Sequence, residues 1–352
     1  MNFTRWGRGG RLGDLMPSPW LARPMRPLDV SWGTLDHWGV HVVGLAVSFL
    51  VALNVAPITI RKLRGAGMLG RDRHKPDRPE VAEMGGVIVF GGFMAGLFMM
   101  LMVGDFGDRV DSLVLATAIL GCGAAITGIL DDFIALRQRF KAFLPFVFAI
   151  PLALFVEDTS ITFPFLGAVD FGLAYAIVLV PLAVACGSNS FNMLEGFNGL
   201  GAGLGLIMSI GITAAAFLGG DLTGLVITIP LAGALAAFLF YNVYPAKVFP
   251  GDTMTLFVGA MLVSAAILSK VEFAAGVLFL PFIVEFFLKA KGSFEVQSFA
   301  ARVEGGRLHH EGPLRSLTHV AMGRAGATEP ALVARLWMVE AALVALVVVW
   351  SV

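Results

Sequence analysis

Residues 199–218 read GLGAGLGLIMSIGITAAAFL, a stretch of twenty residues without a charged side chain. An α-helix needs about 20 mainly apolar residues to cross the hydrocarbon core of a bilayer, so this stretch is predicted to span a membrane. Its glycines favour close helix packing, because small residues let helix backbones approach one another in lipid.

The composition extends this prediction to the whole chain. Of the 352 residues, 57% are hydrophobic and 14% are charged, whereas a soluble domain carries about 25% charged residues. So few charges exclude a soluble globular enzyme, and so much apolar surface excludes intrinsic disorder. The net charge of zero gives no indication of a nucleic-acid partner. Cys122 and Cys186 lie in apolar runs, which argues against a disulfide framework or a cysteine metal site.

Apolar runs of spanning length recur along the chain and predict an all-α polytopic membrane protein with about ten transmembrane helices. The predicted spans are 36–60, 85–103, 112–130, 142–156, 171–187, 199–218, 222–241, 253–269, 271–290 and 332–351. The fourth run is short. We expect an N-terminal tail at 1–35, an integral membrane domain at 36–352, and a long loop at 291–331.

The basic residues predict the orientation. Outside the tail, nearly all Lys and Arg follow odd-numbered spans, and the loops after even-numbered spans carry only Arg109 and Lys270. The positive-inside rule therefore places the odd-numbered loops in the cytoplasm and both termini outside. The five arginines of the tail conflict with that rule. The tail lacks a continuous apolar run, so we expect an amphipathic or irregular surface segment rather than a signal peptide.

Polar and charged residues that can bind ligands or take part in catalysis gather in the predicted cytoplasmic loops and at the adjoining helix ends. They form five short segments, which we call islands. Glu285 is the main acid well inside a span, and Lys289 four residues later is its expected partner. A transporter would more often keep polar residues near the bilayer midplane, on broken helices. The layout favours an enzyme that works at the cytoplasmic membrane surface over a transporter.

The first two polar islands combine acids with cations. Residues 75–86 run from Lys75 through Glu83 to two glycines, and form either a basic loop for lipid headgroups or part of a site. The second island places Asp131 and Asp132 at the end of an apolar helix, shortly before Lys141. Paired carboxylates suit a divalent cation or proton abstraction, although a solvated or salt-bridged pair is the alternative.

The third and fourth islands are rich in amides and turn residues. Residues 189–199 hold three Asn and Glu195; the amides can bind cations, a uracil or a sugar, or can simply form Asn-Gly turns. Asp252 opens a helix after Phe249, Pro250 and Gly251, and is either an N-cap or a tether for a metal beside bound phosphate. Phe249 could stack on a base or pack in lipid.

The fifth island lies in the long loop, at residues 307–312. Arg307 can grip a diphosphate with two hydrogen bonds, and His309 and His310 can donate to phosphate or sugar oxygens. A His-His zinc site would need further ligands that the sequence does not offer nearby.

Together and in this order, the five islands resemble those of the polyprenyl-phosphate N-acetylhexosamine-1-phosphate transferases, over residues 36–351. The most specific parts are Asp131-Asp132 with Lys141, the segment 189–199, and residues 249–252. The resemblance implies ten helices and a Mg²⁺-dependent reaction, with Mn²⁺ as the alternative ion. A polyprenyl phosphate would take a sugar 1-phosphate from a UDP-sugar and release UMP.

The resemblance also implies roles for individual residues. The catalytic group would be Asp131, Asp132, Lys141 and Lys75, and Asn192 and Asp252 would hold the metal. Substrate-binding residues would be Glu83, Asn189, Glu195, Asn198, Phe249, Arg307, His309 and His310. Asn198 and Phe249 would recognise uracil. One-step attack and a covalent aspartyl intermediate both remain open, as does a homodimer, since family members are often dimers.

Two branches of the family compete. The bacterial peptidoglycan branch has Asp-Gly where this chain has Glu195-Gly196, and three histidines where it has residues 307–310. Asn198-Gly199 and the spacing of residues 77–83 look more like the archaeal and eukaryotic N-acetylglucosamine-1-phosphate transferases. We therefore expect UDP-N-acetylglucosamine and a dolichyl-type phosphate as substrates, in a plasma membrane. Transfer of phospho-N-acetylmuramoyl-pentapeptide is the alternative, and a transporter is a distant one.

Overall fold

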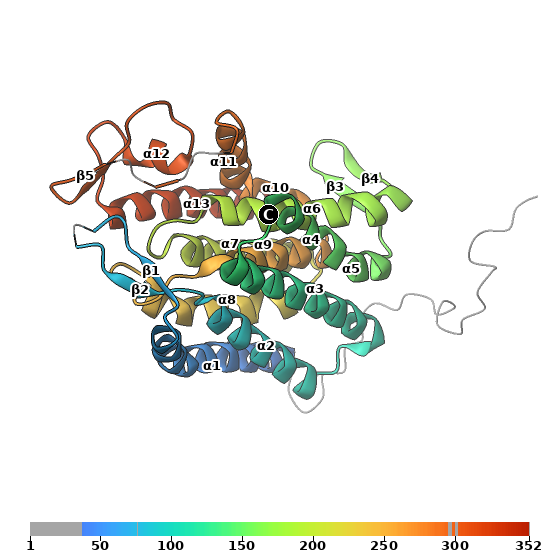
Figure 1. The fold of residues 1–352 in the computed structure, drawn as a ribbon. Helices are drawn as coiled ribbons and strands as arrows, with labels where there is room; N and C mark the ends of the chain where they lie inside the picture. Colours follow the sequence, from blue (N-terminus) through green and yellow to red (C-terminus); the bar gives the residue numbers. More distant parts are fainter. Residues whose placement is uncertain (1–36, 76, 295–297, 300–301, 352) are drawn as a thin grey trace, which may run out of the picture.

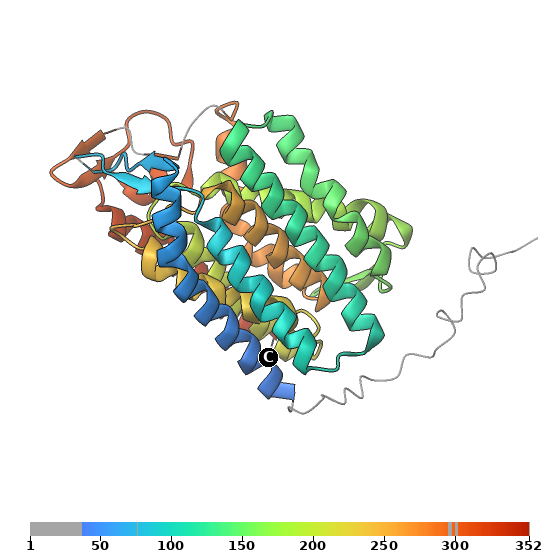
Figure 2. The same ribbon diagram turned by 60° about the horizontal axis from the view of Figure 1, so that its bottom comes forward.

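The computed structural model describes residues 37–75, 77–294, 298–299 and 302–351. The helices lie side by side in one bundle, and the connections gather at its two ends (Figures 1 and 2). The tail predicted at 1–35 lies outside the described residues.

The bundle is built from long helices and several short ones. The helices are α1 (His37–Gly65), α2 (Gly86–Val103), α3 (Gly107–Ile134), α4 (Gln138–Phe148), α5 (Ile150–Phe155), the π-helical turn η2 (Tyr175–Leu179), α6 (Val180–Leu194), α7 (Leu200–Gly219), α8 (Leu225–Asn242), α9 (Gly251–Leu268), α10 (Glu272–Leu278), α11 (Leu280–Ala290), α12 (Leu317–Met322) and α13 (Glu329–Ser351).

Within the described residues, nine helices or continuous helical stretches are long and apolar enough to cross a membrane. The pair α10 and α11, bent by 56°, would make a tenth span. The predicted all-α polytopic fold is therefore confirmed, and the chain is a multi-pass membrane protein. Each of the ten predicted spans overlaps one of these helical stretches.

The main differences from the predicted spans are at their ends. The fourth span begins at Gln138 rather than 142, so Lys141 lies inside α4 instead of in a loop. The fifth runs on to Leu194, so Asn189 and Asn192 lie on the last turns of α6. A residue whose side-chain amide binds a ligand can still lie in a helix when that side chain faces a polar site. The length of an apolar run therefore does not reveal where the helix ends.

Three antiparallel β-hairpins lie outside the helices. At one end of the bundle are β1 (Leu69–Arg71) with β2 (Glu80–Ala82), and β5 (Arg302–Glu304) with β6 (Arg307–His309). The third hairpin, β3 (Ser160–Phe163) with β4 (Gly167–Asp170), lies at the opposite end (Figure 1). The loop predicted at 291–331 thus contains a hairpin and the short helix α12.

Helix α9 is the centre of the bundle. Every residue from Thr253 to Leu268 is buried, and α2, α3, α6, α7, α8 and α10 all contact it (Figure 1). Close approach depends on glycine: a Cβ at Gly128 in α3 would lie 2.4 Å from Thr253 Cα, and one at Gly259 would lie 2.5 Å from the carbonyl oxygen of Gly187. Glycine therefore sets how closely α3 and α6 pack on the central helix.

Two acids are fully buried within spans. Glu285 pairs with Lys289 at 3.4 Å, as expected, and also accepts hydrogen bonds from the Ser316 hydroxyl and the Leu317 N–H. This carboxylate therefore holds the start of α12 against α11. Glu340 in α13 is also fully buried, and neither carboxyl oxygen has a hydrogen-bond partner among the described residues.

We expect Gly259→Ala to lower the thermal unfolding temperature of the detergent-solubilised protein, because the new methyl group must push α6 away from α9. Overpacking of this kind costs about 1–3 kcal/mol. Gly91→Ala in α2 is the matched control, since no heavy atom outside its own helix lies within 4 Å of a Cβ there. Equal melting temperatures for the two variants would contradict the role of Gly259 in packing.

Candidate active site

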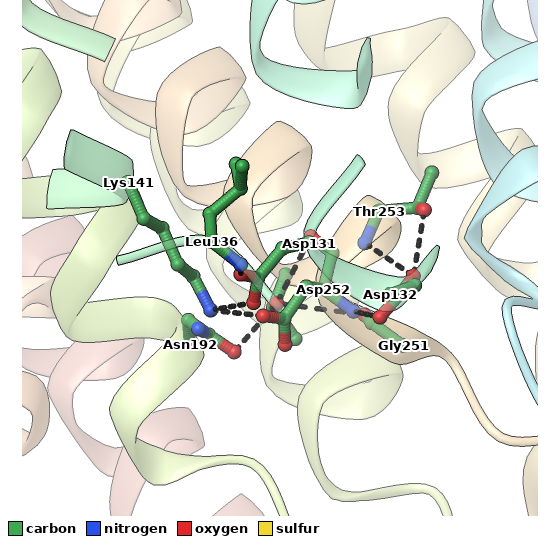
Figure 3. A network of polar contacts seen from close by, with 9 residues as sticks. Asp131, Asp132, Leu136, Lys141, Asn192, Gly251, Asp252 and Thr253 are labelled. Atoms are coloured by element: carbon green, nitrogen blue, oxygen red, sulfur yellow. Dashed lines mark hydrogen bonds and ion pairs between the residues drawn. The ribbon is translucent and has the colours of Figure 1, made fainter. Parts of the chain in front are cut away.

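The ammonium group of Lys141 joins three segments of the chain. It donates to Oδ2 of Asp131 at 2.7 Å and contacts Oδ2 of Asp252 (Figure 3). Asp131 lies near the end of α3, Lys141 in the first turn of α4 and Asp252 in the first turn of α9. The Lys141 side chain is only 7% exposed, so two carboxylates share one enclosed positive charge.

Asp132 faces a different partner, the N-terminus of α9. Its carboxylate accepts hydrogen bonds from the backbone N–H of Asp252 at 2.9 Å and from the hydroxyl of Thr253 at 2.9 Å (Figure 3). It thereby caps α9 from another helix, because the first N–H groups of a helix lack partners within that helix. Gly251 makes this approach feasible: it has φ +66°, and a Cβ there would lie 2.6 Å from Asp132 Oδ2.

Asn192 stands beside this cluster, and its amide has two orientations. In one, Oδ1 accepts from the Thr255 hydroxyl at 2.9 Å and also faces the Asp252 carboxylate. In the other, the amide nitrogen donates to Oδ1 of Asp252 at 3.0 Å and the oxygen accepts from Lys141 at 2.9 Å. The second orientation satisfies both atoms of the amide, whereas the first places its oxygen against the Asp252 carboxylate.

A cavity of about 410 Å³ adjoins the cluster at the end of the bundle that carries β1 and β2. Its size suits a small-molecule ligand. Six residues predicted from sequence line it: Glu83, Asn192, Glu195, Asn198, Phe249 and Asp252. The lining also includes residues that the sequence pattern does not indicate, among them Asp72, His74, Phe197 and Phe299.

Backbone pairing brings the first and fourth islands together. The N–H of Phe249 donates to the carbonyl of Ala82 at 2.7 Å, and the N–H of Gly85 donates to the carbonyl of Phe249 at 2.8 Å. Glu83 and Phe249 therefore stand side by side on the cavity wall. Desolvation there, with the charge of Asp132, raises the pKa of Glu83 above its usual value.

Glu195 turns its carboxyl toward the start of α7. Burial raises the pKa of Glu195 to about 7, although hydrogen bonds from the backbone N–H groups of Gly196 and Gly201 act in the opposite direction. The close approach needs Gly201, because a Cβ there would lie 1.8 Å from Glu195 Oε2. Near neutral pH this carboxyl can therefore be either protonated or charged.

Lys75 is not part of the Lys141 cluster. Its ammonium contacts Oδ2 of Asp72, and that oxygen also accepts from the amide of Asn198 at 3.1 Å. Glu329, at the start of α13, accepts from the backbone N–H of Asn198 at 2.8 Å. Asp72, His74 and Glu329 offer ligand atoms within 4.8 Å of one another, but the Lys75 ammonium already supplies a cation at Asp72.

The remaining predicted residues lie outside the cavity lining. Arg307, in β6, donates to the carbonyl of Gly326 at 3.2 Å, and His309 is next to that glycine. His310 stacks on His319 with a ring-centroid distance of 3.5 Å. These contacts hold the β5–β6 hairpin against the segment before α13.

Asn189 contacts helices rather than the cavity. Its amide nitrogen donates to the carbonyls of Ala142 at 3.1 Å and Ala185 at 2.8 Å. The side chain thereby links α6 to α4. The role of Asn189 in substrate binding stays a prediction, as do those of Arg307, His309 and His310.

The residues missed from sequence had only weak signals. Asp72 precedes Lys75 by three residues, in the same basic loop, and Glu329 is an acid at the first turn of an apolar span. Each is ordinary by itself. The two become part of one site only because the fold brings both to Asn198.

Comparison with known proteins agrees with this architecture. The model of the family described as glycosyl transferase family 4 matches residues 112–270, which include the Lys141 cluster, α6 and α9. A protein of Saccharolobus solfataricus, provisionally named UDP-N-acetylglucosamine–dolichyl-phosphate N-acetylglucosaminephosphotransferase, is 36% identical over 311 residues, or 87% of this chain and 95% of the relative.

Two further relatives cover similar shares of this chain. A protein of Sulfolobus acidocaldarius with the same provisional name is 35% identical over 89% of this chain and 98% of its own length. The phospho-N-acetylmuramoyl-pentapeptide-transferase of Desulforamulus reducens is 29% identical over 85% of this chain and 92% of its own length. The chain belongs to glycosyl transferase family 4, and the resemblance to membrane N-acetylhexosamine-1-phosphate transferases is confirmed.

We expect Asp132→Ala to destabilise the protein by about 1–2 kcal/mol, because the first turn of α9 loses its cap. Asp132→Asn should lose less, since its amide oxygen can still accept one of these hydrogen bonds. Thermal unfolding in detergent measures both effects. An Asp132→Ala variant with the same melting temperature as the wild type would contradict the capping role of Asp132.

Proposed function

We propose that this protein transfers N-acetylglucosamine 1-phosphate from UDP-N-acetylglucosamine to a dolichyl-type polyprenyl phosphate and releases UMP. The observation that carries the proposal is the Lys141 cluster, which stands beside a cavity at the end of a membrane bundle. An acceptor phosphate held in the membrane and a soluble nucleotide sugar can meet at such an end. The names of the archaeal relatives support the same reaction.

The electrostatics of the site suit the meeting of two phosphates. Lipid phosphate and diphosphate repel each other, so cations and aligned dipoles are needed to bring them together. Lys141 supplies a fixed positive charge that Asp131 and Asp252 already share, so a bound divalent cation would have to supply the rest; the N-termini of α4 and α9 lie beside it. The dipole of a helix favours anions near its N-terminus, although at α9 the N–H groups of Asp252 and Thr253 are already engaged by Asp132.

The donor set of Asn192 and Asp252 fits a magnesium ion. Mg²⁺ binds six oxygens at about 2.0–2.1 Å, which places neighbouring ligand oxygens about 3 Å apart. Turning the Asn192 amide puts its nitrogen 3.0 Å from Oδ1 of Asp252, so an oxygen in the same place has the spacing of two ligands of one ion. A bound Mg²⁺ would neutralise diphosphate charge, and Mn²⁺ has similar ligand preferences.

The proposed chemistry is a displacement at the phosphorus that carries the sugar. An oxygen of the lipid phosphate attacks this phosphorus, and its bond to the oxygen shared with the uridine-bearing phosphorus breaks, so that UMP leaves. Asp131 accepts any proton on the attacking phosphate, and Lys141 holds that phosphate in line. Asp132 keeps Asp252 in place through the cap of α9.

The nucleotide would occupy the cavity on the other side of Asp252. Phe249 offers a face for stacking on uracil, and Asn198 offers its amide to the edge of the base. Lys75 would act through Asp72 rather than on phosphate, because its ammonium contacts the Asp72 carboxylate. Arg307, His309 and His310 would have to reach the sugar from the β5–β6 hairpin.

The site would face the cytoplasm, in a plasma membrane. The cations of α1, β1 and the loop around Lys75 lie at the same end of the bundle as the cavity, and the acidic β3–β4 end lies opposite. Cytoplasmic loops of membrane proteins carry the excess of Lys and Arg, which supports this orientation.

The first test is UMP release by purified protein supplied with Mg²⁺ and polyprenyl phosphate. We expect turnover with UDP-N-acetylglucosamine and little or none with UDP-N-acetylmuramoyl-pentapeptide. The reverse preference would keep the reaction class and overturn the proposed sugar. Release with neither sugar would contradict the proposed function.

In the same assay, we expect Asp252→Asn to lower turnover by about 10²–10³-fold, the usual effect of losing a main charge-stabilising group. The variant should also need more Mg²⁺ for half-maximal turnover, since one negative ligand is gone. Asp108→Asn is the matched control: Asp108 is exposed at the other end of the bundle. Near-normal turnover by Asp252→Asn would contradict the proposal that Asp252 binds the metal ion.

A further inference from the structure

The backbone of Asn198 is fixed from the side of α13. Oε1 of Glu329 accepts from its N–H at 2.8 Å, across 131 residues of sequence. Asn198 is itself 5% exposed and lies just before Gly199, whose φ of +84° turns the chain into α7. Glu329 is 4% exposed and contacts Asn198 from outside the cavity lining.

The side chain of Asn198 is fixed from the opposite direction. Its amide nitrogen donates to Oδ2 of Asp72, whose side chain is 2% exposed. The Lys75 ammonium contacts the same oxygen, and the N–H of His74 donates to the other oxygen at 3.2 Å. Burial raises the pKa of Asp72, but the hydrogen bonds from Lys75 and Asn198 outweigh burial and lower it.

An ionised carboxylate can only accept hydrogen bonds, so the amide of Asn198 must present its nitrogen to Asp72. Its oxygen then faces away from Asp72. Among the described residues nothing donates to this oxygen, and Asn198 lines the cavity. The Asn198 oxygen is therefore available to a ligand in the cavity as a hydrogen-bond acceptor, whereas one N–H of the amide is already engaged by Asp72.

Stacking holds the two loops together. The ring of His74 lies 4.5 Å from the ring of Phe197 with an interplanar angle of 5°, immediately before Asn198. Burial lowers the pKa of His74 to about 4, so the imidazole is neutral near pH 7 and adds no charge to this stack. The segments 72–75 and 197–198 thus form one unit.

We propose that Asp72 and Glu329 are positioning residues that lock the Asn198 amide with its oxygen toward the cavity, so that the site selects a base with a ring N–H. Uracil presents such an N–H at its imide edge, whereas the same position of cytosine is an acceptor and would face the Asn198 oxygen unfavourably. This inference rests on the proposed function, which places a uridine nucleotide in the cavity. It assigns nucleotide selection to two acids that act through Asn198: Asp72, which also lines the cavity, and Glu329, which does not.

The test is binding of UMP and CMP to full-length detergent-solubilised protein, measured by calorimetry and so independent of turnover. We expect the wild type to prefer UMP. Asp72→Asn keeps the shape of the side chain but can donate, so the Asn198 amide can turn over. The preference for UMP over CMP should fall about tenfold or more, the effect of one hydrogen bond. Asp108→Asn should keep the wild-type ratio.

A second pair of variants tests Glu329. Glu329→Gln retains an oxygen for the Asn198 N–H and should keep the preference, whereas Glu329→Ala should reduce it and raise the KM for the UDP-sugar more than it lowers kcat. Melting temperatures identify any variant that fails to fold.

The outcomes separate this inference from the proposed function. An unchanged UMP:CMP ratio in folded Asp72→Asn, or in folded Glu329→Ala, would overturn the positioning role and leave the proposed reaction standing. Failure of the wild type to bind either nucleotide would overturn both. A preference for UMP without transfer of N-acetylglucosamine 1-phosphate would support the positioning role and contradict only the proposed reaction.

Discussion

The contact of one ammonium group with two carboxylates ties this structure together. Lys141 draws Asp131 at the end of α3 and Asp252 at the start of α9 into a single cluster. Removing one member of a buried ion pair strands a charge at a cost of about 3–5 kcal/mol. The three segments are therefore bound to a common arrangement, and α9, the most buried helix, is held at the end where the cavity lies.

Asp132, next to Asp131, shows that two adjacent carboxylates can have different partners and different roles. Asp131 faces Lys141, while Asp132 is engaged by N–H and hydroxyl donors of the α9 N-terminus. Consecutive residues of a helix point about 100° apart, so an Asp-Asp pair at a helix end reaches two surroundings. One carboxylate is left near the position proposed for phosphate, and the other keeps its support rigid.

At the end of the cavity proposed for the nucleotide, one residue again lines the site while others hold it in position. Asn198 lines the cavity together with Asp72, which holds its side chain, while Glu329 holds its backbone from outside the lining. An amide is symmetric in shape but not in chemistry, so it discriminates between ligands only if its surroundings fix its orientation. In both halves of the site, polar groups that are distant in sequence fix the residues that would meet substrate.

Much of the fold follows from sequence because a spanning helix is a local feature, set by about 20 apolar residues in a row. The ten spans, the Glu285–Lys289 pair and the gathering of Glu83, Asn192, Asn198, Phe249 and Asp252 at one end could all be predicted. Alternating spans return odd-numbered loops to the same side, which brings those residues to one face. The β-hairpins and the helical positions of Asn189 and Asn192 could not, since the signals there are short and polar.

The sequence by itself determined the class of fold, the end of the bundle that bears the candidate site, and six of the residues that line its cavity. Only the tertiary structure decided which of them touch: that Lys141 meets Asp252 across 111 residues, that Lys75 serves Asp72, and that Glu329 reaches Asn198. The physical reason is that helix faces toward lipid and toward protein are both apolar. Sideways packing therefore leaves little trace in the pattern, although it sets every distance within the site.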